Sequence, residues 1–330
     1  MKDMPSFLKR EGPLLIIKKL RAGYVTRNGV IKAVNNVSFG VSHGELLGIV
    51  GESGCGKSTL ALAIMRLLNP PGFIKNGQVL FKGIDLLKLK KEELRRIRWK
   101  HISYIPQSSM NALNPVLNIE KQMMDVILTH KRGISKKELK EKILTSLHRV
   151  GLSSEIIKMY PHELSGGMRQ RVIIALATVL NPELIIADEP TTALDVVTQK
   201  EVLQLLTYIK HKSKSSIILI THDMGIHAEI SERLLVMYAG KIVEAGDVVD
   251  IFNEPLHPYT QMLISAIPSI KRKKGLLSIP GLPPDLRTLP SGCYFHPRCP
   301  HLIHGKCDIK KPKPIRVKQN RIVWCHLYGD

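Results

Sequence analysis

The residues best suited to chemistry form a glycine-rich loop, GESGCGKST, at 51–59. The loop follows the apolar run LLGIV at 46–50 and precedes residues 58–68, where apolar side chains recur at helical spacing. A strand, such a loop and a helix in this order indicate a phosphate-binding loop, because glycines let successive backbone N–H groups point at phosphate oxygens. Lys57 would supply a charge for the β- and γ-phosphates and Ser58 a hydroxyl for Mg²⁺. The residues predicted to contact a nucleotide here are Gly51, Glu52, Ser53, Gly54, Cys55, Gly56, Lys57, Ser58 and Thr59.

Two adjacent carboxylates form the second candidate group. LIIADEP at 184–190 places Asp188 and Glu189 at the end of an apolar run. Such a pair is costly unless a cation lies near it. Asp188 is therefore predicted to hold Mg²⁺ through water and Glu189 to polarise an attacking water. The alternative interpretation is an acidic pair that caps a helix.

A histidine follows a further apolar run. ITHD at 220–223 places His222 directly after SIILI at 216–220. The carboxyl end of a parallel strand lies at the sheet edge where ligands bind. Alone, His222 would be interpreted as a core or turn histidine. Together with the loop and the carboxylates, it is predicted to sense the γ-phosphate.

The elements that must position these residues alternate between strands and helices. Residues 14–45 predict β-hairpins, and four short apolar runs predict buried strands at 46–50, 184–187, 216–220 and 234–238. Helices are expected near 58–68, 136–149, 167–180, 198–211 and 255–268. This alternation predicts an α/β domain with a mainly parallel sheet. From 279 the chain is rich in Pro, Gly, Cys and His, so it cannot build a core unaided.

Length and composition restrict the class of protein. The chain has 330 residues, 44% of them hydrophobic, which allows one large and one smaller domain. The net charge of +21 favours a solvated basic surface or attraction to anionic lipid headgroups. Nucleic-acid binding is not expected, because no basic run is interleaved with stacking aromatics. Without an apolar run of about 18 residues or a signal peptide, the protein is expected to stay in the cytoplasm.

The sequence LSGGMRQR at 164–171 resembles the signature motif of ABC ATPases. The resemblance implies a P-loop NTPase (RecA-like) core with an antiparallel β subdomain and a helical signature subdomain. It also implies that Ser165, Gly166 and Gly167 approach a phosphate, whereas Met168 departs from the Gln of many members. Further matches give Gln107 a role with Mg²⁺ and water, Tyr24 a stacking role on adenine, and 193–195 the role of a D-loop. The active unit of this family is a head-to-tail pair, so ATP would join two ATPase subunits.

A narrower resemblance covers nearly the whole chain. SSMNALNPV at 108–116, PLHPYTQMLISAIP at 255–268 and the cysteine-bearing tail are similar to oligopeptide/dipeptide importer ATPases. This implies a nucleotide-binding domain at 1–255, with a helical subdomain at about 106–165, and a C-terminal extension at 256–330. It implies an ATP-hydrolysing importer subunit on the cytoplasmic side of the cell membrane. The implied partners are a second, different ATPase, two transmembrane permease subunits and an external binding protein.

Other functions stay open at this point. Relatives of the subfamily also import oligosaccharides or nickel, so the cargo is not fixed. A soluble ABC ATPase of DNA repair or translation is disfavoured by the single cassette and the short separation of loop and signature. An exporter ATPase is disfavoured by the tail. The expected reaction is ATP + H₂O → ADP + phosphate, with Glu189 as general base and with Gln107 and His222 aligning water and γ-phosphate.

Four of the five cysteines are clustered in the tail. Cys293, Cys299, Cys307 and Cys325 have five, seven and seventeen residues between them. They form no paired C-x-x-C knuckle of the kind that zinc ribbons use, so a [4Fe–4S] cluster is favoured over Zn²⁺. Some peptide-importer ATPases carry such a cluster in this tail. Free or disulfide-linked cysteines remain alternatives, and four histidines could replace a ligand: His296, His301, His304 and His326. The expected role is a structural staple, with redox sensing as the alternative.

Overall fold

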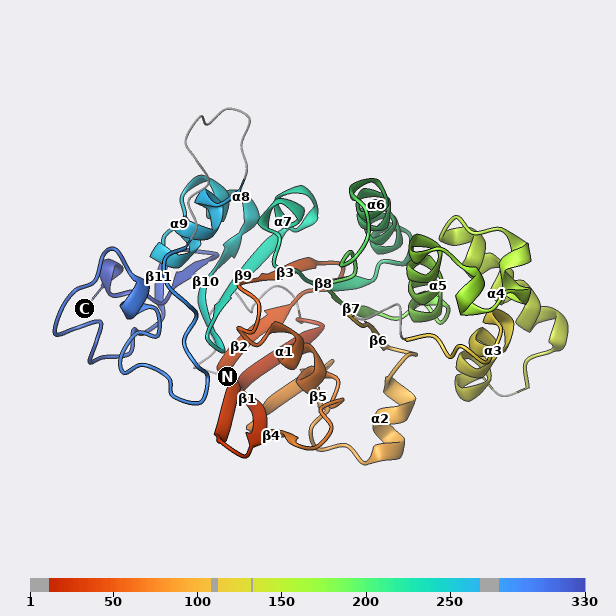
Figure 1. Cartoon of the computed structure of the whole chain (residues 1–330). Coiled ribbons are helices and arrows are strands. Elements are labelled where there is room, and N and C mark those ends of the chain that lie inside the picture. Colours follow the sequence, from red (N-terminus) through yellow and green to blue (C-terminus); the bar gives the residue numbers. More distant parts are fainter. Residues whose placement is uncertain (1–11, 108–111, 132, 268–278, 330) are drawn as a thin grey trace. The chain divides into compact units, whose positions relative to one another are not determined.

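The computed structural model describes residues 12–107, 112–131, 133–267 and 279–329 (Figure 1). Some segments with sequence-based expectations lie partly or wholly outside these residues. They are the N-terminal 1–11, residues 108–111 of SSMNALNPV, Pro268 of the helix expected at 255–268, and the charged stretch at 271–275. The chain forms two compact units. The first contains 1–42, 46–88 and 220–330, and the second contains 43–45 and 89–219.

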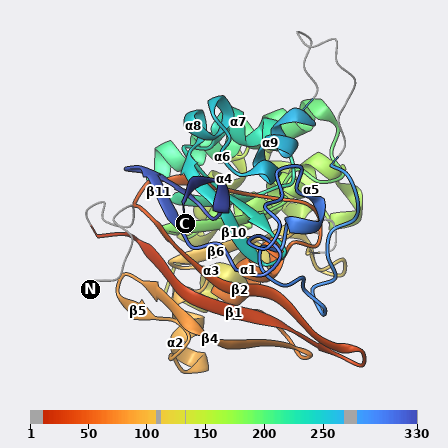
Figure 2. The same cartoon turned by 90° about the vertical axis from the view of Figure 1, so that its left-hand side faces the viewer.

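An antiparallel sheet opens the first unit. Its strand order is β2-β1-β4-β5, and β1 pairs with both β2 and β4. Figure 2 shows these three strands side by side. The hairpin predicted at 14–45 is confirmed, with Leu15 opposite Val41 and Thr26 opposite Gly29. The strands are β1 (Leu15–Thr26), β2 (Gly29–Val41), β4 (Gly72–Phe81) and β5 (Ile84–Asp85).

A second sheet in this unit combines parallel and antiparallel strands. Its order here is β11-β12-β10-β9-β3, with β3 parallel to β9 and the remaining pairs antiparallel. The strands are β3 (Leu46–Val50), β9 (Arg233–Tyr238), β10 (Lys241–Asp247), β11 (Ile315–Lys318) and β12 (Arg321–Val323). Because β12 pairs with β10, the tail adds its strands to this sheet instead of forming a core of its own.

The helices of the first unit are short. They are α1 (Lys57–Ile64), α7 (Met224–Ile230), α8 (Val248–Asn253) and α9 (Pro258–Ser265), with 3-10 turns at His296–Arg298 and His326–Tyr328. The helix expected at 58–68 ends at Ile64 because Arg66 takes a positive φ of 52° and Pro70 and Pro71 follow. The helix expected at 255–268 begins only at Pro258, because proline suits the first helical position and disfavours helical backbone at the residue before it.

The second unit pairs three strands and carries five α-helices among its described residues. The strand order is β8-β7-β6, and β6 runs parallel to β7 from Ile102↔Leu184 to Ile105↔Ala187. The strands are β6 (Ile102–Ile105), β7 (Leu184–Asp188) and β8 (Ser216–Ile220). The helices are α2 (Lys91–Ile97), α3 (Ile119–His130), α4 (Lys136–Arg149), α5 (Gly166–Thr178) and α6 (Val196–Ser213). Short 3-10 turns occupy Ser154–Lys158 and Pro161–Glu163.

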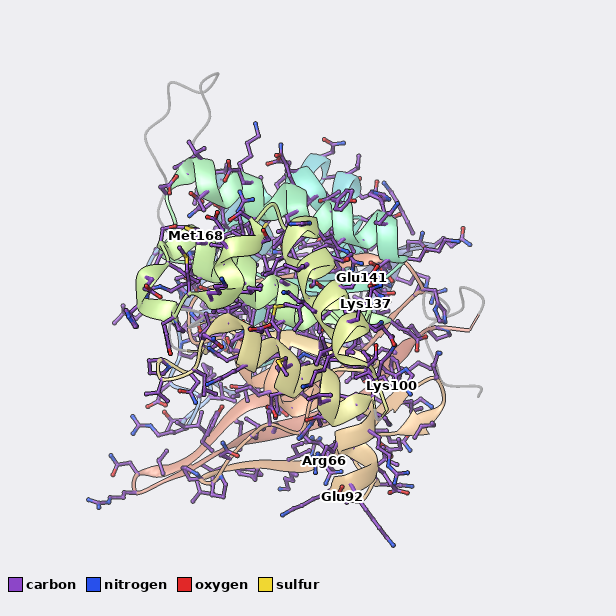
Figure 3. All side chains as sticks on the ribbon, turned by 90° about the vertical axis from the view of Figure 1, so that its right-hand side faces the viewer. Arg66, Glu92, Lys100, Lys137, Glu141 and Met168 are labelled. Atoms are coloured by element: carbon purple, nitrogen blue, oxygen red, sulfur yellow. The ribbon has the colours of Figure 1, made fainter. Side chains whose placement is uncertain are left out.

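Helix α4 follows its sequence pattern closely. Ser135 caps its first turn by accepting the N–H of Glu138, and the buried face repeats at Leu139, Ile143 and Leu147. Lys137 and Glu141 lie one turn apart on its exposed side (Figure 3). No helix in the described ranges has both the length and the apolarity needed to cross a bilayer.

Candidate nucleotide site

The phosphate loop lies between buried strand β3 and helix α1, as predicted. Gly51, Gly54 and Gly56 take φ angles of 156°, 77° and 108°, which side chains rarely adopt. A Cβ atom on Gly56 would lie 1.9 Å from the carbonyl oxygen of Ala33, and one on Gly51 would lie 2.1 Å from that of Met237. Gly51 and Gly56 therefore cannot carry a side chain for two reasons: their φ angles and the close approach of a carbonyl oxygen.

Lys57 lies inside this loop. Its side chain is buried, and its Nζ donates to the carbonyl oxygens of Gly51 at 2.7 Å and Glu52 at 3.0 Å. The thiol of Cys55 lies 3.9 Å from the same ammonium, and burial raises the pKa of that thiol. The loop therefore holds a cation among its own carbonyl oxygens, next to a cysteine that remains a neutral thiol.

Tyr24 lies close to the loop in the first unit. Its hydroxyl is 3.4 Å from Oγ1 of Thr59, in the first turn of α1. The structure thus brings the predicted adenine-stacking residue to the predicted phosphate-binding residues. His222 belongs to the same unit and is exposed just after β8. The following residue, Asp223, caps α7 by accepting the N–H of Gly225 at 2.7 Å.

Glu52 makes contacts that the sequence patterns do not indicate. Its carboxylate accepts from both terminal nitrogens of Arg298, at 2.8 and 2.9 Å. Its backbone N–H donates to the hydroxyl of Tyr259 at 2.8 Å. This amide therefore has a protein partner, although the sequence assigned Glu52 only a nucleotide contact.

The two carboxylates of the second unit stand at the end of β7. Asp188 is 1% exposed and accepts from the hydroxyl of Tyr104 at 3.0 Å. Glu189 has a positive φ of 46°, and its Oε2 accepts from Gln107 at 3.2 Å and from Thr192 at 2.9 Å. Gln107 and Glu189, predicted from separate motifs, are thus in direct contact. A strained backbone conformation at such a position is typical of a functional site.

Two contacting residues were missed by sequence reasoning. Tyr104 lies in the YIPQ segment two positions before Pro106, and its side chain leaves strand β6 toward Asp188. Thr192 lies three residues after Glu189 and reaches back to it. Both residues stand in or next to a segment already singled out in the sequence, and both carry a hydroxyl group that can donate to a carboxylate. These two properties together could have identified them.

The signature segment begins a helix. Ser165 is exposed and caps α5 by accepting the N–H of Met168 at 3.3 Å, and Met168 is labelled at this helix in Figure 3. Gly166 and Gly167 form its first turn, and a Cβ on Gly167 would lie 2.8 Å from Cγ2 of Thr198. The N–H groups and the positive end of the helix dipole at this end favour an anion.

The D-loop residues lead into the next helix. Ala193 has a φ of 64°. Asp195 caps α6 by accepting from Val197 at 3.1 Å and from the N–H and hydroxyl of Thr198 at 3.0 and 2.7 Å. These hydrogen bonds, those of Thr198 first, lower the pKa of the Asp195 carboxyl.

The four tail cysteines are free thiols near one another but are not arranged as ligands. Within the described part of the chain, no group of three or more His, Cys, Asp or Glu residues is placed to hold a metal ion. Burial raises the pKa of Cys293 to about 11 and of Cys325 to about 12, with smaller contributions from the other tail cysteines. The expected cluster site is therefore not preformed, and the disulfide alternative is not observed.

Two of the four nearby histidines contact backbone carbonyl oxygens. His296 Nδ1 lies 2.9 Å from the carbonyl oxygen of Cys293, and His326 Nε2 lies 2.9 Å from that of Lys310. His301 and His304 are exposed. In the described part of the chain, no histidine joins other side chains in a group that could hold a metal ion.

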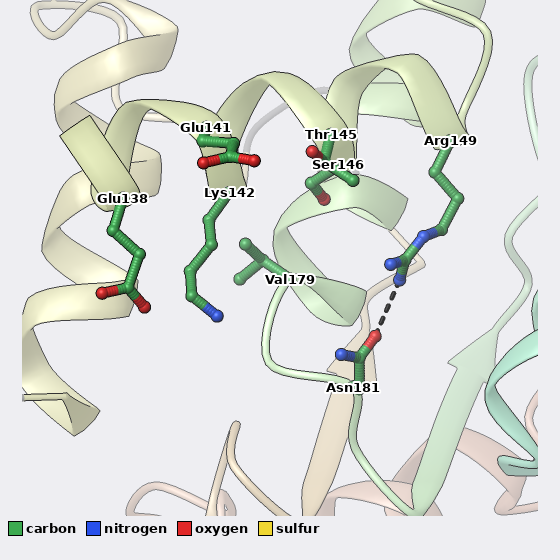
Figure 4. Close-up of a pocket in the computed structure, with 8 residues that line it drawn as sticks. All are labelled: Glu138, Glu141, Lys142, Thr145, Ser146, Arg149, Val179 and Asn181. Atoms are coloured by element: carbon green, nitrogen blue, oxygen red, sulfur yellow. Dashed lines mark hydrogen bonds between the residues drawn. The ribbon is translucent and has the colours of Figure 1, made fainter. Parts of the chain in front are cut away.

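A surface cavity of about 300 Å³ lies in the second unit beside α4 (Figure 4). At its rim Arg149 donates to Oδ1 of Asn181 at 2.7 Å. The lining contains none of the predicted nucleotide-site residues. It consists of Glu138, Glu141, Lys142, Thr145, Ser146, Arg149, Val179 and Asn181.

Comparisons with known proteins agree with these features. A family model described as ABC transporter matches residues 34–192, and one described as oligopeptide/dipeptide transporter, C-terminal region, matches residues 243–307. A dipeptide transport ATP-binding protein of Caldanaerobacter subterraneus subsp. tengcongensis is 43% identical over 319 residues, which cover 96% of this chain and 98% of that protein. An oligopeptide transport ATP-binding protein of Salmonella typhimurium is 46% identical over 291 residues, with 87% and 86% covered.

Solved structures give the same fold. A dimeric bacterial ABC transporter cassette, MJ0796, matches with a TM-score of 0.64 and 29% identity, covering 71% of this chain and 98% of that one. The protein cbiO1 from Clostridium perfringens, part of the ABC transporter complex cbiONQ, matches with a TM-score of 0.62 and 26% identity, covering 74% of this chain and 92% of that one. The predicted α/β P-loop NTPase fold is thus confirmed. This chain belongs to the ABC transporter family, among the ATP-binding proteins of dipeptide and oligopeptide transport.

Proposed function

We propose that this chain is the ATP-binding, ATP-hydrolysing subunit of an ABC importer for di- or oligopeptides. The observation that carries the proposal is the glycine-constrained loop at 51–56, which holds Lys57 at the beginning of α1. Residues 243–307 support peptides as the transported substrate, because they match the C-terminal region of oligopeptide/dipeptide transporters. We assign 1–255 to the nucleotide-binding domain, with a helical subdomain at about 106–165, and 256–330 to the extension.

The chemistry would be phosphoryl transfer to water by positioning and charge stabilisation. Glu189 is proposed as general base, because two donors, Gln107 and Thr192, fix one of its carboxylate oxygens. Asp188 is a buried carboxylate that suits a hydrated Mg²⁺. Ser58 and Gln107 are the other proposed Mg²⁺ contacts, and the ion would neutralise charge on the β- and γ-phosphates. His222 would contact the γ-phosphate.

The partners would be those of an importer. One related cassette has a dimeric structure, and we propose a head-to-tail pair with a second, different ATPase. In that pair Ser165, Gly166 and Gly167 of one subunit would complete the phosphate site of the other. Two transmembrane permease subunits and an external binding protein would complete the assembly. The chain would then lie peripherally on the cytoplasmic side of the cell membrane.

Substitution Glu189→Gln tests the catalytic assignment. Loss of a general base lowers the rate by about 10²–10⁴, so hydrolysis should fall that far while Mg-ATP still binds. Phosphate release and nucleotide affinity are measured on the chain with its partner ATPase. Glu201→Gln is the matched control, since Glu201 is a half-exposed carboxylate of α6 that pairs with Arg171 at 2.7 Å. A normal rate in Glu189→Gln would refute the assignment.

Purification from membranes tests the transport assignment. A chain that carries two integral membrane proteins with it, and whose ATPase rate rises with peptide-loaded binding protein, behaves as proposed. A rise with an oligosaccharide or nickel instead would keep the motor and change the cargo. Association with ribosomes or DNA, and with no membrane protein, would contradict the proposal.

We further propose that the four tail cysteines bind a [4Fe–4S] cluster, with Zn²⁺ as the alternative. Support comes from the fold of the extension, in which the N–H of Cys293 donates to the carbonyl oxygen of Cys307 at 2.8 Å and the four thiols lie near enough to influence one another's pKa values. Their side chains would have to rearrange to become ligands, because no preformed metal-binding group is found among the described residues. Anaerobic purification followed by iron and sulfide assays is the measurement. Equimolar iron and sulfide, about four of each per chain, is the expected result, and a colourless protein containing zinc alone would exclude the cluster.

A further inference from the structure

The C-terminal extension makes direct contact with the phosphate loop. Two of its residues, Tyr259 in α9 and Arg298 in the turn at His296–Arg298, both contact Glu52. Arg298 donates Nη1 and Nη2 to the two carboxylate oxygens at 2.8 and 2.9 Å. The planar guanidinium matches a carboxylate in this two-bond geometry, and such pairs are among the stronger hydrogen-bonded pairs.

This contact is largely removed from water. The side chain of Arg298 is 5% exposed and that of Glu52 is 22% exposed, and Tyr259 is fully buried. The hydrogen bonds to Glu52 raise the pKa of Arg298, and burial raises the pKa of Tyr259. Both groups therefore keep their protonation across physiological pH, as a cation and as a neutral phenol.

The surroundings of Arg298 hold it in place. Its Nε donates to the carbonyl oxygen of Pro280 at 2.8 Å, and its Nη1 lies 3.3 Å from the hydroxyl of Tyr238. Tyr238, Tyr259 and Phe295 pack as an aromatic group, with centroid distances of 4.6 to 5.4 Å. The guanidinium is thus fixed by a core that the extension and strand β9 share.

Glu52 in turn organises the loop. Its carbonyl oxygen accepts from Lys57 Nζ at 3.0 Å and from the N–H of Cys55 at 3.2 Å. Its N–H is held by Tyr259 and its carboxylate by Arg298. A displacement of Glu52 would therefore move both Lys57 and the backbone that leads to Gly56.

We propose that Arg298 and Tyr259 are positioning residues for phosphate binding, so that the affinity of the loop for Mg-ATP depends on the C-terminal extension. They act through Glu52 and do not touch the nucleotide. The proposal rests on nucleotide binding by the loop, which is the proposed function. It makes the extension a part of the nucleotide site and not only an attachment to the cassette.

The test compares Arg298→Ala with Arg287→Ala in the full chain. Arg287 belongs to the same extension and also pairs with a carboxylate, Asp285, but that pair is more exposed, at 38% and 41% of the two side chains. A fluorescent ATP analogue with Mg²⁺ gives the dissociation constant, and thermal unfolding without nucleotide gives the stability. Arg298→Ala should weaken binding by about tenfold, the size expected when a residue acts on the ligand only through a neighbouring side chain, and Arg287→Ala should not.

Two further variants separate positioning from general stability. Tyr259→Phe removes only the hydroxyl that holds the Glu52 amide, so the aromatic packing stays and affinity should still fall severalfold. In the double variant Glu52→Gln/Arg298→Ala, the loss should be smaller than the product of the single losses, because both remove one interaction. Arg298→Lys should recover part of the affinity.

The outcomes distinguish this inference from the function on which it rests. If the unaltered chain does not bind Mg-ATP, the proposed function fails. If it binds, and folded Arg298→Ala and Tyr259→Phe bind equally well, only the inference is overturned. Should Arg298→Ala not fold, the result for Tyr259→Phe and Arg298→Lys decides: unchanged affinity in both overturns it.

Discussion

The phosphate loop and the cysteine-bearing extension are positioned by different means. In the loop, backbone atoms set the geometry: Gly56 approaches the Ala33 carbonyl so closely that a Cβ would lie 1.9 Å away. In the extension, the geometry is set by ion pairs between side chains that are far apart in the sequence, Arg298–Glu52 and Arg321–Glu244. A local motif can therefore be recognised from nine residues. The arrangement of the four cysteines depends on packing instead, and in the described part of the chain that packing does not place them as metal ligands.

The largest expected effect tests the backbone side of this comparison. In Gly56→Ala the added methyl must displace β2, and a shift of about 1 Å in an active site can cost about 10² in rate. ATP hydrolysis should fall at least that far. Gly54→Ala is the matched control, because Gly54 also has a positive φ, 77°, but has no atom within 4 Å of an added Cβ.

The control should suffer only conformational strain, about 1–2 kcal/mol. Hydrolysis and Mg-ATP affinity are measured for both variants. Equal losses in Gly54→Ala and Gly56→Ala would mean that the close approach to Ala33 does not matter. The view that close backbone contacts fix the geometry of the loop would then be wrong.

The next effect concerns the attachment of the extension. Glu244 is fully buried, accepts the N–H groups of Leu256 and His257 at 2.9 and 3.0 Å, and pairs with Arg321. Breaking a buried pair by removing one partner costs about 3–5 kcal/mol, so Arg321→Met should lower the free energy of unfolding by that amount. Denaturant and thermal unfolding measure it.

Lys318→Met supplies the comparison for this pair. Lys318 pairs with Glu254 at 3.1 Å, but the side chains are 55% and 66% exposed. Exposed pairs contribute about 0–1 kcal/mol, so this variant should unfold almost as the parent does. If Arg321→Met were equally mild, side-chain pairs could not be what anchors the extension.

The last effect is a pH dependence, which is smallest near neutral pH and grows as the pH falls. Burial lowers the pKa of His257 to about 3 and that of His227 to about 4. Between these values and the ordinary 6.5, the unfolded chain binds protons that the folded chain does not. Stability is therefore fully present above pH 6.5 and falls below it, by up to about 1.4 kcal/mol per pH unit for each histidine.

His257→Asn isolates the contribution of the extension. Asn cannot titrate but can still accept the N–H of Tyr259, which His257 accepts at 3.1 Å. The melting temperature should then decline less steeply than in the parent between pH 6.5 and 4.5. An unchanged decline would show that burial of His257 does not contribute to acid sensitivity.

Much of the fold was predictable from the sequence. Short apolar runs indicate buried strands, and apolar residues at helical spacing indicate the buried face of a helix. The predicted helix at 136–149 coincides with α4, whose cap and buried stripe are both local in sequence. Helix α3 was missed although Asn118 caps it, since its buried residues Ile119, Met123 and Ile127 stand among polar neighbours. Strand β6 was missed because its four residues, ISYI, include Ser103 and Tyr104 and so do not form an uninterrupted apolar run.

The candidate site divides in the same way. Loop residues such as Lys57 were found because their spacing is dictated by the phosphate geometry. The Arg298–Glu52 pair spans 246 positions, and no local pattern carries that information. The predicted metal site also depends on long-range packing, because spacing in the sequence does not determine the directions of four thiols. Its predicted ligands were Cys293, Cys299, Cys307 and Cys325.

The pairing of β12 with β10 also has a consequence for solubility. Glu244 and Ala245 of β10 lie opposite Val323 and Ile322, so backbone groups of β10 are covered by the chain's own tail. An uncovered strand of this kind invites pairing with other molecules. The last strand in the order, β11, is short and bears the exposed cations Arg316 and Lys318. The tail therefore replaces an apolar sheet edge with a charged one that discourages aggregation.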